Sequence, residues 1–166
     1  MSVVAARRFA GGFEIAADSI LVRYCTQLVG NLKRSKLWEQ DGLIVGGVGT
    51  SEESVQLQSF STTHRPADAS TDAIAQFLSE FAFWKKQRTE KFAVQNDFIF
   101  GLDGRLFANH SLSVVEIETF EAIGAGQDFA LAAMHLGKSV VEAVELACDL
   151  SILCERPVQL KRYVRA

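Results

Sequence analysis

The first seventeen residues contain two short apolar stretches separated by one glycine-rich turn. Residues 3–9 and 13–17 are mostly apolar, and an Ala-Gly-Gly turn lies between them at residues 10–12. Glycine tolerates the positive φ angles that tight hairpin turns require, and apolar runs of this length are typical of strands. The pattern therefore predicts a β-hairpin at the start of the chain.

A buried strand and a helix start follow an irregular stretch. Residues 19–31 show no clear period, residues 33–38 have the composition of a short strand, and the apolar run 43–48 suits a buried strand. Threonine at position 50 and glutamate at position 53 form a capping box. This pair predicts a helix N-terminus directly after Gly49.

The clearest helix of the chain spans residues 70–88. Its apolar positions recur every three or four residues and form one face, made by Ile74, Phe77, Leu78, Phe81 and Trp84. Asp72 lies in the first turn and basic residues lie in the last, as the helix dipole favours. Residues 61–69, just before it, are expected to form a polar loop.

The second half of the chain repeats this order of strands and helices. We expect strands at residues 92–100 and 105–110, one or two more within 114–123, and a closing strand at 159–164. A helix should follow Gly126 and end at Gly137. A second capping box at Ser139 and Glu142 should begin another helix, which must end before Pro157.

The order of these elements predicts the fold class. Strands, two helices, strands, two helices and a final strand favour an α+β fold with two antiparallel sheets covered by helix layers. A strictly alternating βαβ sheet does not have this order. At 166 residues, the simplest organisation is one domain that spans residues 1–166.

Composition and charge exclude several classes of function. Apolar residues make up 48% and charged residues 22%, and the net charge of −3 offers no surface for nucleic acid or an anionic membrane. The three cysteines, Cys25, Cys148 and Cys154, lack metal-ligand spacing and are interpreted as free thiols in a reducing compartment. With neither a signal-peptide pattern nor a long apolar run, we expect a cytoplasmic protein without metal or other cofactors.

Ser2 is the candidate nucleophile. Because the residue after Met1 is small, we expect removal of Met1, which would leave a hydroxyl and a free α-amine on Ser2 at the end of a buried strand. An α-amine has an unperturbed pKa of about 7.7–8.0 and can therefore act as a general base near neutral pH. A nucleophile and a base on one residue form a recognised catalytic arrangement.

Together these residues resemble a β-type subunit of the proteasome superfamily, and more narrowly the bacterial protease subunit HslV. The resemblance rests on the first strand, Ala16-Ala17-Asp18-Ser19, the segment with Lys33, the strand into Gly49-Thr-Ser-Glu-Glu53, and the stretch from Phe98 to Gly126 with its helix pair. It implies the four-layer αββα fold of N-terminal-nucleophile hydrolases. It also implies a self-compartmentalising peptidase: homo-oligomeric rings that stack on one another and receive unfolded protein from an ATPase unfoldase.

The resemblance assigns four site residues. Ser2 takes the nucleophile position, where the family normally has threonine, and Gly49 takes that of the oxyanion-hole glycine. Asp18 and Lys33 take the positions of a conserved acid and lysine. An ammonium group beside Ser2 would favour loss of the serine proton, and Asp18 would hold that lysine charged. The Gly49 N–H, at a helix N-terminus, would face the developing oxyanion.

The identity of the inward-pointing cation stays open at this point. Arg34 and Lys36 lie close to Lys33, and a shift of register in the irregular segment before them changes which side chain points inward. Arginine there could supply charge but not an ammonium whose pKa is easily tuned.

Two departures from the family pattern keep other functions open. The family often has a serine between the glycines at 124 and 126, where this chain has Ala125. Asp149 and Ser151 match only poorly the acid and serine that the family places near the end of its last long helix. The alternatives are a catalytically inactive ring-forming homologue with a structural role, and an amidase of the same fold that acts on a small amide.

Overall fold

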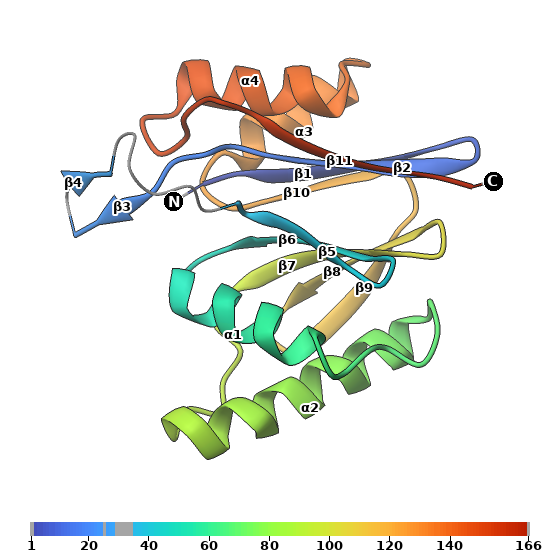
Figure 1. The fold of residues 1–166 in the computed structure, drawn as a ribbon. Coiled ribbons are helices and arrows are strands. Elements are labelled where there is room, and N and C mark those ends of the chain that lie inside the picture. Colours follow the sequence, from blue (N-terminus) through green and yellow to red (C-terminus); the bar gives the residue numbers. More distant parts are fainter. Residues whose placement is uncertain (1, 25, 29–34, 166) are drawn as a thin grey trace.

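Two β-sheets stack face to face, and a pair of helices covers each outer face (Figure 1). The structure is a computed structural model that describes residues 2–24, 26–28 and 35–165. This four-layer αββα arrangement confirms the predicted α+β fold class. No helix in the described part of the chain is long and apolar enough to cross a membrane.

The first sheet is built around the N-terminal hairpin. Its strands, in spatial order, are β10 (Phe120–Ile123), β1 (Val4–Phe9), β2 (Gly12–Ala17) and β11 (Gln159–Val164). All neighbouring strands are antiparallel. Helices α3 (Gln127–His135) and α4 (Val140–Leu150) cover its outer face. The hairpin therefore lies at the centre of the sheet, flanked by strands from the far end of the chain.

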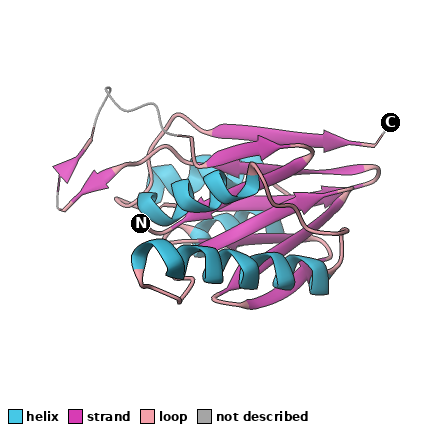
Figure 2. Ribbon diagram, turned by 60° about the horizontal axis from the view of Figure 1, so that its bottom comes forward, coloured by secondary structure: helices cyan, strands magenta, loops and turns pink. Residues whose placement is uncertain are grey.

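The second sheet comes from the middle of the chain. Its strands, in both spatial and chain order, are β5 (Leu37–Gln40), β6 (Leu43–Val48), β7 (Asp97–Leu102), β8 (Arg105–His110) and β9 (Ser113–Ile117). Helices α1 (Ser51–Ser61) and α2 (Thr71–Thr89) cover its outer face (Figure 2). A small hairpin of β3 (Val22–Arg23) and β4 (Thr26–Gln27) lies to the side of both sheets.

Three apolar clusters fill the spaces between the four layers. Side chains of successive strand residues point to opposite faces, so Val4 and Ala6 pack between the sheets whereas Val3 and Ala5 pack under α3 and α4. The third cluster joins the second sheet to α1 and α2 and is rich in phenylalanine, including Phe77. The alternation of β1 thus binds the first sheet to both neighbouring layers.

Most expected elements are confirmed. The hairpin, the strand at 43–48, the strand at 105–110 and the closing strand are present, and α2 begins after the N-cap Ser70. Residues 114–123 form two strands, β9 and β10, which belong to different sheets. The chain therefore crosses from one sheet to the other between them.

Two strand boundaries were wrong. The strand expected at 92–100 begins only at Asp97, because the N–H groups of Gln95 and Asn96 donate to the Glu53 carboxylate. The short strand expected at 33–38 begins at Leu37 and extends to Gln40, and residues 33 and 34 lie outside the described residues.

The phenylalanine cluster under α2 should contribute most of the stability of the second sheet and the two helices that cover it. We expect Phe77→Ala to lower the free energy of unfolding by about 3–5 kcal/mol, since Phe77 is 1% exposed and its loss leaves a cavity. Phe83→Ala on the same helix is the matched control, because Phe83 is 60% exposed. Equal losses for the two variants in urea denaturation would contradict the assignment of this core.

Candidate active site

Ser2 lies just before β1, in contact with two segments from the C-terminal half. It is 6% exposed. Its backbone N–H donates to the Leu153 carbonyl at 2.9 Å, and its own carbonyl accepts the Gly126 N–H at 3.2 Å. A Cβ on Gly124, whose φ is +95°, would lie 2.5 Å from the Ser2 carbonyl oxygen, so this close approach requires glycine. Ser2 itself has φ 105°, where residues with side chains are rare.

Asp18, at the end of β2, is fully buried and makes four polar contacts. Its Oδ1 accepts the Val3 N–H at 2.9 Å and an Nζ proton of Lys36 at 2.6 Å. Its Oδ2 accepts the N–H groups of Ile20 at 3.0 Å and Glu155 at 3.2 Å. A buried carboxylate is tolerated only when its lost hydration is replaced in this way. Asp18 therefore joins the N-terminal strand to the segment after α4.

Lys36 supplies the positive charge beside Asp18. Its side chain is 10% exposed, and it precedes β5. Burial lowers the pKa of Lys36 from its ordinary value, while the Asp18 carboxylate acts in the opposite direction. The ammonium is thus less strongly protonated than a surface lysine, although its counter-ion is in direct contact.

Gly49 lies between β6 and α1, in a conformation that requires glycine. Its φ is +121°, and a Cβ there would lie 2.2 Å from the Asn96 Oδ1. The next residue, Thr50, is the N-cap of α1, and its side chain accepts the Glu53 N–H. The helix start predicted after Gly49 is confirmed, and the positive end of the α1 dipole lies at this turn.

One pocket brings three of these residues together. It has a volume of about 100 Å³ and is lined by Ser2, Lys36 and Gly49. The other lining residues are Ile20, Leu21, Val22, Ser35, Trp38, Gly47, Val48, Thr50, Ser51, Ser54, Val55 and Gln58. Lys36 is the only charged residue in this described lining, and its ion pair with Asp18 compensates that charge. The pocket is therefore apolar and hydroxyl-rich around a single compensated cation.

Three of the four residues assigned from the sequence lie around this pocket or directly behind it. Ser2 and Gly49 line it, and Asp18 holds the lysine that does. The fourth, Lys33, lies outside the described residues. Lys36, the neighbour that the sequence left open, makes the contact with Asp18.

Asp149, Ser151 and Ala125 are the positions at which the chain departs from the family pattern, and each has its own surroundings. Asp149 accepts a hydrogen bond from Arg156 at 2.7 Å near the surface, and this contact lowers its pKa. The Ser151 hydroxyl accepts the Leu153 N–H at 3.2 Å and so shapes the segment that touches Ser2. Ala125 is exposed in the loop that contacts Ser2 and offers no hydroxyl there.

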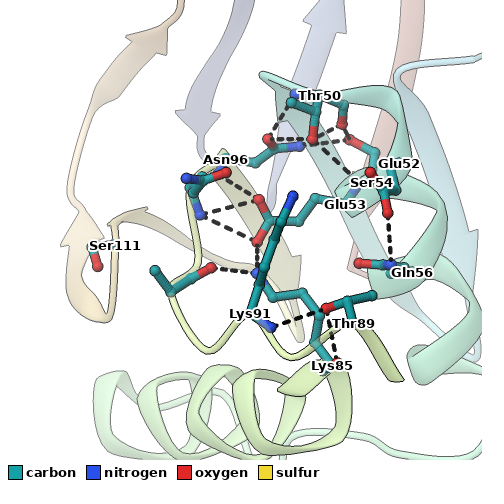
Figure 3. A network of polar contacts seen from close by, with 12 residues as sticks. Thr50, Glu52, Glu53, Ser54, Gln56, Lys85, Thr89, Lys91, Asn96 and Ser111 are labelled. Atoms are coloured by element: carbon teal, nitrogen blue, oxygen red, sulfur yellow. Dashed lines mark hydrogen bonds and ion pairs between the residues drawn. The ribbon is translucent and has the colours of Figure 1, made fainter. Parts of the chain in front are cut away.

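A buried polar network behind Gly49 was not predicted from the sequence. Glu53, Lys85 and Asn96 are each at most 4% exposed and are linked by hydrogen bonds (Figure 3). The position of Lys85 in the sequence could have indicated a buried ion pair, because Lys85 lies four residues after Phe81 on the apolar face of α2. A lysine at such a position is rarely buried without a partner.

No group of three or more potential ligands in the described part of the chain could hold a metal ion.

Cys148 and Cys154 are free thiols, and burial raises the pKa of both. The nearby Asp18 carboxylate acts in the same direction on each thiol. Both groups thus stay protonated at neutral pH.

Comparison with known proteins identifies the fold. No protein-family model and no curated protein sequence matches the chain. Among solved structures, Thiobacillus denitrificans BPH in complex with Epoxomicin superposes with a TM-score of 0.89 at 18% identity, over 99% of both chains. Anbu (ancestral beta-subunit) from Yersinia bercovieri gives 0.74 at 16% identity, over 98% of this chain and 81% of that chain. Eukaryotic HslV from Trypanosoma brucei gives 0.72 at 16% identity, over 98% and 99%.

These likenesses show that the chain has the proteasome β-type, HslV-like fold of N-terminal-nucleophile hydrolases. The resemblance drawn from the sequence is therefore confirmed at the level of the fold.

The partly buried surroundings of Cys148 should be measurable in the reactivity of its thiol. Since its pKa is raised from 9.0 to about 12 and the thiolate is the reactive form, we expect native Cys148 to alkylate roughly a thousandfold more slowly at pH 8 than in the unfolded chain. The native rate should still be rising tenfold per pH unit at pH 9–10. Peptide-resolved mass spectrometry after iodoacetamide treatment measures both, and equal native and unfolded rates would contradict this environment.

Proposed function

We propose that the chain is a peptidase subunit that cleaves peptide bonds with Ser2, freed by removal of Met1, as its N-terminal nucleophile. The observation that carries this proposal is the pocket lined by Ser2, Lys36 and Gly49, with Asp18 behind the lysine. A hydroxyl, a compensated ammonium and a glycine at a helix N-terminus are the groups that acyl transfer needs. The positive φ of Ser2 also supports it, because cleavage before Ser2 removes the peptide bond that defines this angle.

The reaction follows from the properties of these groups. The Ser2 α-amine accepts the hydroxyl proton while Oγ attacks the substrate carbonyl, and the Lys36 ammonium favours loss of that proton. The Gly49 N–H, with the α1 dipole behind it, stabilises the oxyanion. The α-amine then returns the proton to the leaving amine, and an ester remains on Ser2. Water, activated by the same amine, hydrolyses the ester and regenerates the hydroxyl.

The lining of the pocket favours an apolar substrate side chain. Val48, Val55 and Trp38 contribute apolar surface, and the single cation already has a counter-ion. An acidic substrate side chain would therefore lose hydration without gaining a free partner. Peptides with an uncharged apolar residue before the cleaved bond are the substrates to test first.

We further propose self-association into a ring and delivery of unfolded protein by an ATPase unfoldase. The end of α4 supports self-association, because Leu146, Leu150 and Ile152 are 38%, 58% and 93% exposed. Exposed apolar side chains that lie together are typical of protein interfaces. An enclosed chamber would also prevent folded proteins from reaching the site.

Ala125 favours one alternative, a catalytically inactive ring-forming homologue. It lies in the loop whose Gly126 N–H contacts Ser2, where a hydroxyl would help to set the protonation of the α-amine. A small-molecule amidase of the same fold remains the other alternative. Cleavage of unfolded casein would exclude the amidase.

Ser2 should react as a nucleophile with a free amine. A peptide epoxyketone such as Epoxomicin, the ligand of the similar BPH, forms its stable adduct with a residue that presents both a hydroxyl and an α-amine. Intact mass spectrometry should therefore show loss of Met1 and one adduct per chain. Ser2→Ala should keep the native mass of the assembly and lose both the adduct and hydrolysis. Retained Met1 with no adduct would favour the inactive homologue.

Lys36, rather than Lys33, should tune the nucleophile. We expect Lys36→Ala to lower kcat for peptide hydrolysis by about 10²–10⁴-fold, since it removes the cation that favours proton transfer from Ser2. Lys36→Arg should recover little, because a guanidinium has a different shape and a fixed charge. Lys33→Ala is the matched control and should change kcat by less than about threefold. The reverse order of the two alanine variants would return the role to Lys33.

A further inference from the structure

The turn that carries Gly49 is held by a side chain from another part of the chain. Asn96 Oδ1 accepts the Thr50 N–H at 2.7 Å, and its Nδ2 donates to the Thr50 carbonyl at 2.8 Å and to Ser54 Oγ at 3.1 Å (Figure 3). Both backbone groups of Thr50 are thus bound by one amide. The Thr50 N–H belongs to the same peptide group as the Gly49 carbonyl, so this contact fixes the plane that follows Gly49.

Asn96 is in turn clamped from behind. Its own N–H donates to Glu53 Oε2 at 3.0 Å, and Glu53 Oε1 accepts an Nζ proton of Lys85 at 2.6 Å. Lys85 also donates to the Ala93 carbonyl, in the segment that leads to Asn96. The two charged side chains are each 5% exposed. A buried ion pair between α1 and α2 therefore holds the loop that presents Asn96.

This arrangement exceeds what a helix start needs. In α4 the same motif closes on itself, since the Ser139 hydroxyl accepts the Glu142 N–H and the Glu142 carboxylate accepts the Ser139 N–H. In α1 the returning half is replaced, because Asn96 takes the Thr50 N–H and frees the glutamate for Lys85. A local capping box would have begun α1 without burying two charges, whose desolvation is costly.

We propose that Asn96 is a positioning residue that holds Gly49 in the geometry required of an oxyanion donor, with Glu53 and Lys85 as its clamp. The inference rests on the proposed function. The Gly49 N–H belongs to the peptide group before Gly49, and Asn96 holds the peptide group after it. Because glycine has the widest choice of φ and ψ of any residue, the first group keeps one direction relative to the second only when neighbouring groups restrain this turn. An oxyanion donor that is already in place costs no reorganisation during the reaction, which is where its benefit to rate arises.

The test compares two buried asparagines. Asn96→Ala removes the amide from Thr50, whereas Asn109→Ala removes an amide that binds the Phe98 N–H at 2.7 Å and the Ser111 carbonyl at 2.7 Å. Asn109 reaches this network only through a 3.4 Å contact with the Asn96 carbonyl. The two variants should lose similar thermal stability. Only Asn96→Ala should lower kcat, by about 10²-fold with KM within about twofold, as expected for a displaced oxyanion donor.

Amide hydrogen exchange supplies a readout that does not depend on activity. Exchange of the Thr50 N–H should become at least about tenfold faster in Asn96→Ala and stay slow in Asn109→Ala and in Ser2→Ala, because only the first removes its acceptor. Asn96→Asp keeps that oxygen and should therefore keep Thr50 protected, with a smaller loss of kcat. This variant also serves if Asn96→Ala does not fold.

The outcomes separate the inference from the proposed function. Unchanged Thr50 exchange in Asn96→Ala, or an equal fall of kcat in the two alanine variants, would overturn the positioning role. A wild-type protein that neither hydrolyses peptides nor takes up the epoxyketone would overturn the proposed function. In such a protein, faster Thr50 exchange in Asn96→Ala would still support Asn96 as the residue that positions this turn.

Discussion

The buried carboxylate of Asp18 is the contact on which the site depends. It binds the N–H of Val3 beside Ser2, the N–H groups of Ile20 and Glu155, and the ammonium of Lys36. Four parts of the chain meet at this one group, and none of them neutralises it except Lys36. Because an unpaired carboxylate inside a protein is costly, each contact stabilises the others. Ser2, the proposed nucleophile, and Lys36 are thereby placed by the same side chain that orders the end of the first sheet.

The packing of the two sheets sets the separation between Ser2, the proposed nucleophile, and Gly49, the proposed oxyanion donor. Ser2 precedes a strand of the first sheet, and Gly49 follows a strand of the second. Val4 and Val48, close neighbours of these two residues, belong to the same apolar cluster between the sheets. Well-packed interiors deform little, so this cluster fixes the distance across the pocket. The geometry of the site therefore depends on the packing of the apolar core between the sheets.

The two capping motifs show where the molecule departs from the simplest local solution. Ser139 and Glu142 satisfy each other at the start of α4. Thr50 and Glu53 do so only in part, and the remaining bonds connect α1, α2 and the loop before β7 through Asn96 and the Glu53–Lys85 ion pair. Departures from local rules are expected near functional sites, where the geometry of the site matters more than the simplest local hydrogen bonding. Here the departure lies directly beside Gly49.

The sequence by itself predicted two antiparallel sheets covered by helix layers, because the order of the elements follows from local patterns such as apolar runs, the apolar face of α2 and both helix starts. Through the resemblance to the HslV type, it also singled out Ser2, Asp18, Lys33 and Gly49, of which Lys33 lies outside the described residues. Only the tertiary structure decided that Lys36 contacts Asp18, since the irregular segment before it has no period that fixes register. The Asn96 network likewise required the folded chain, because hydrogen bonds between residues more than forty positions apart leave no periodic trace in the sequence.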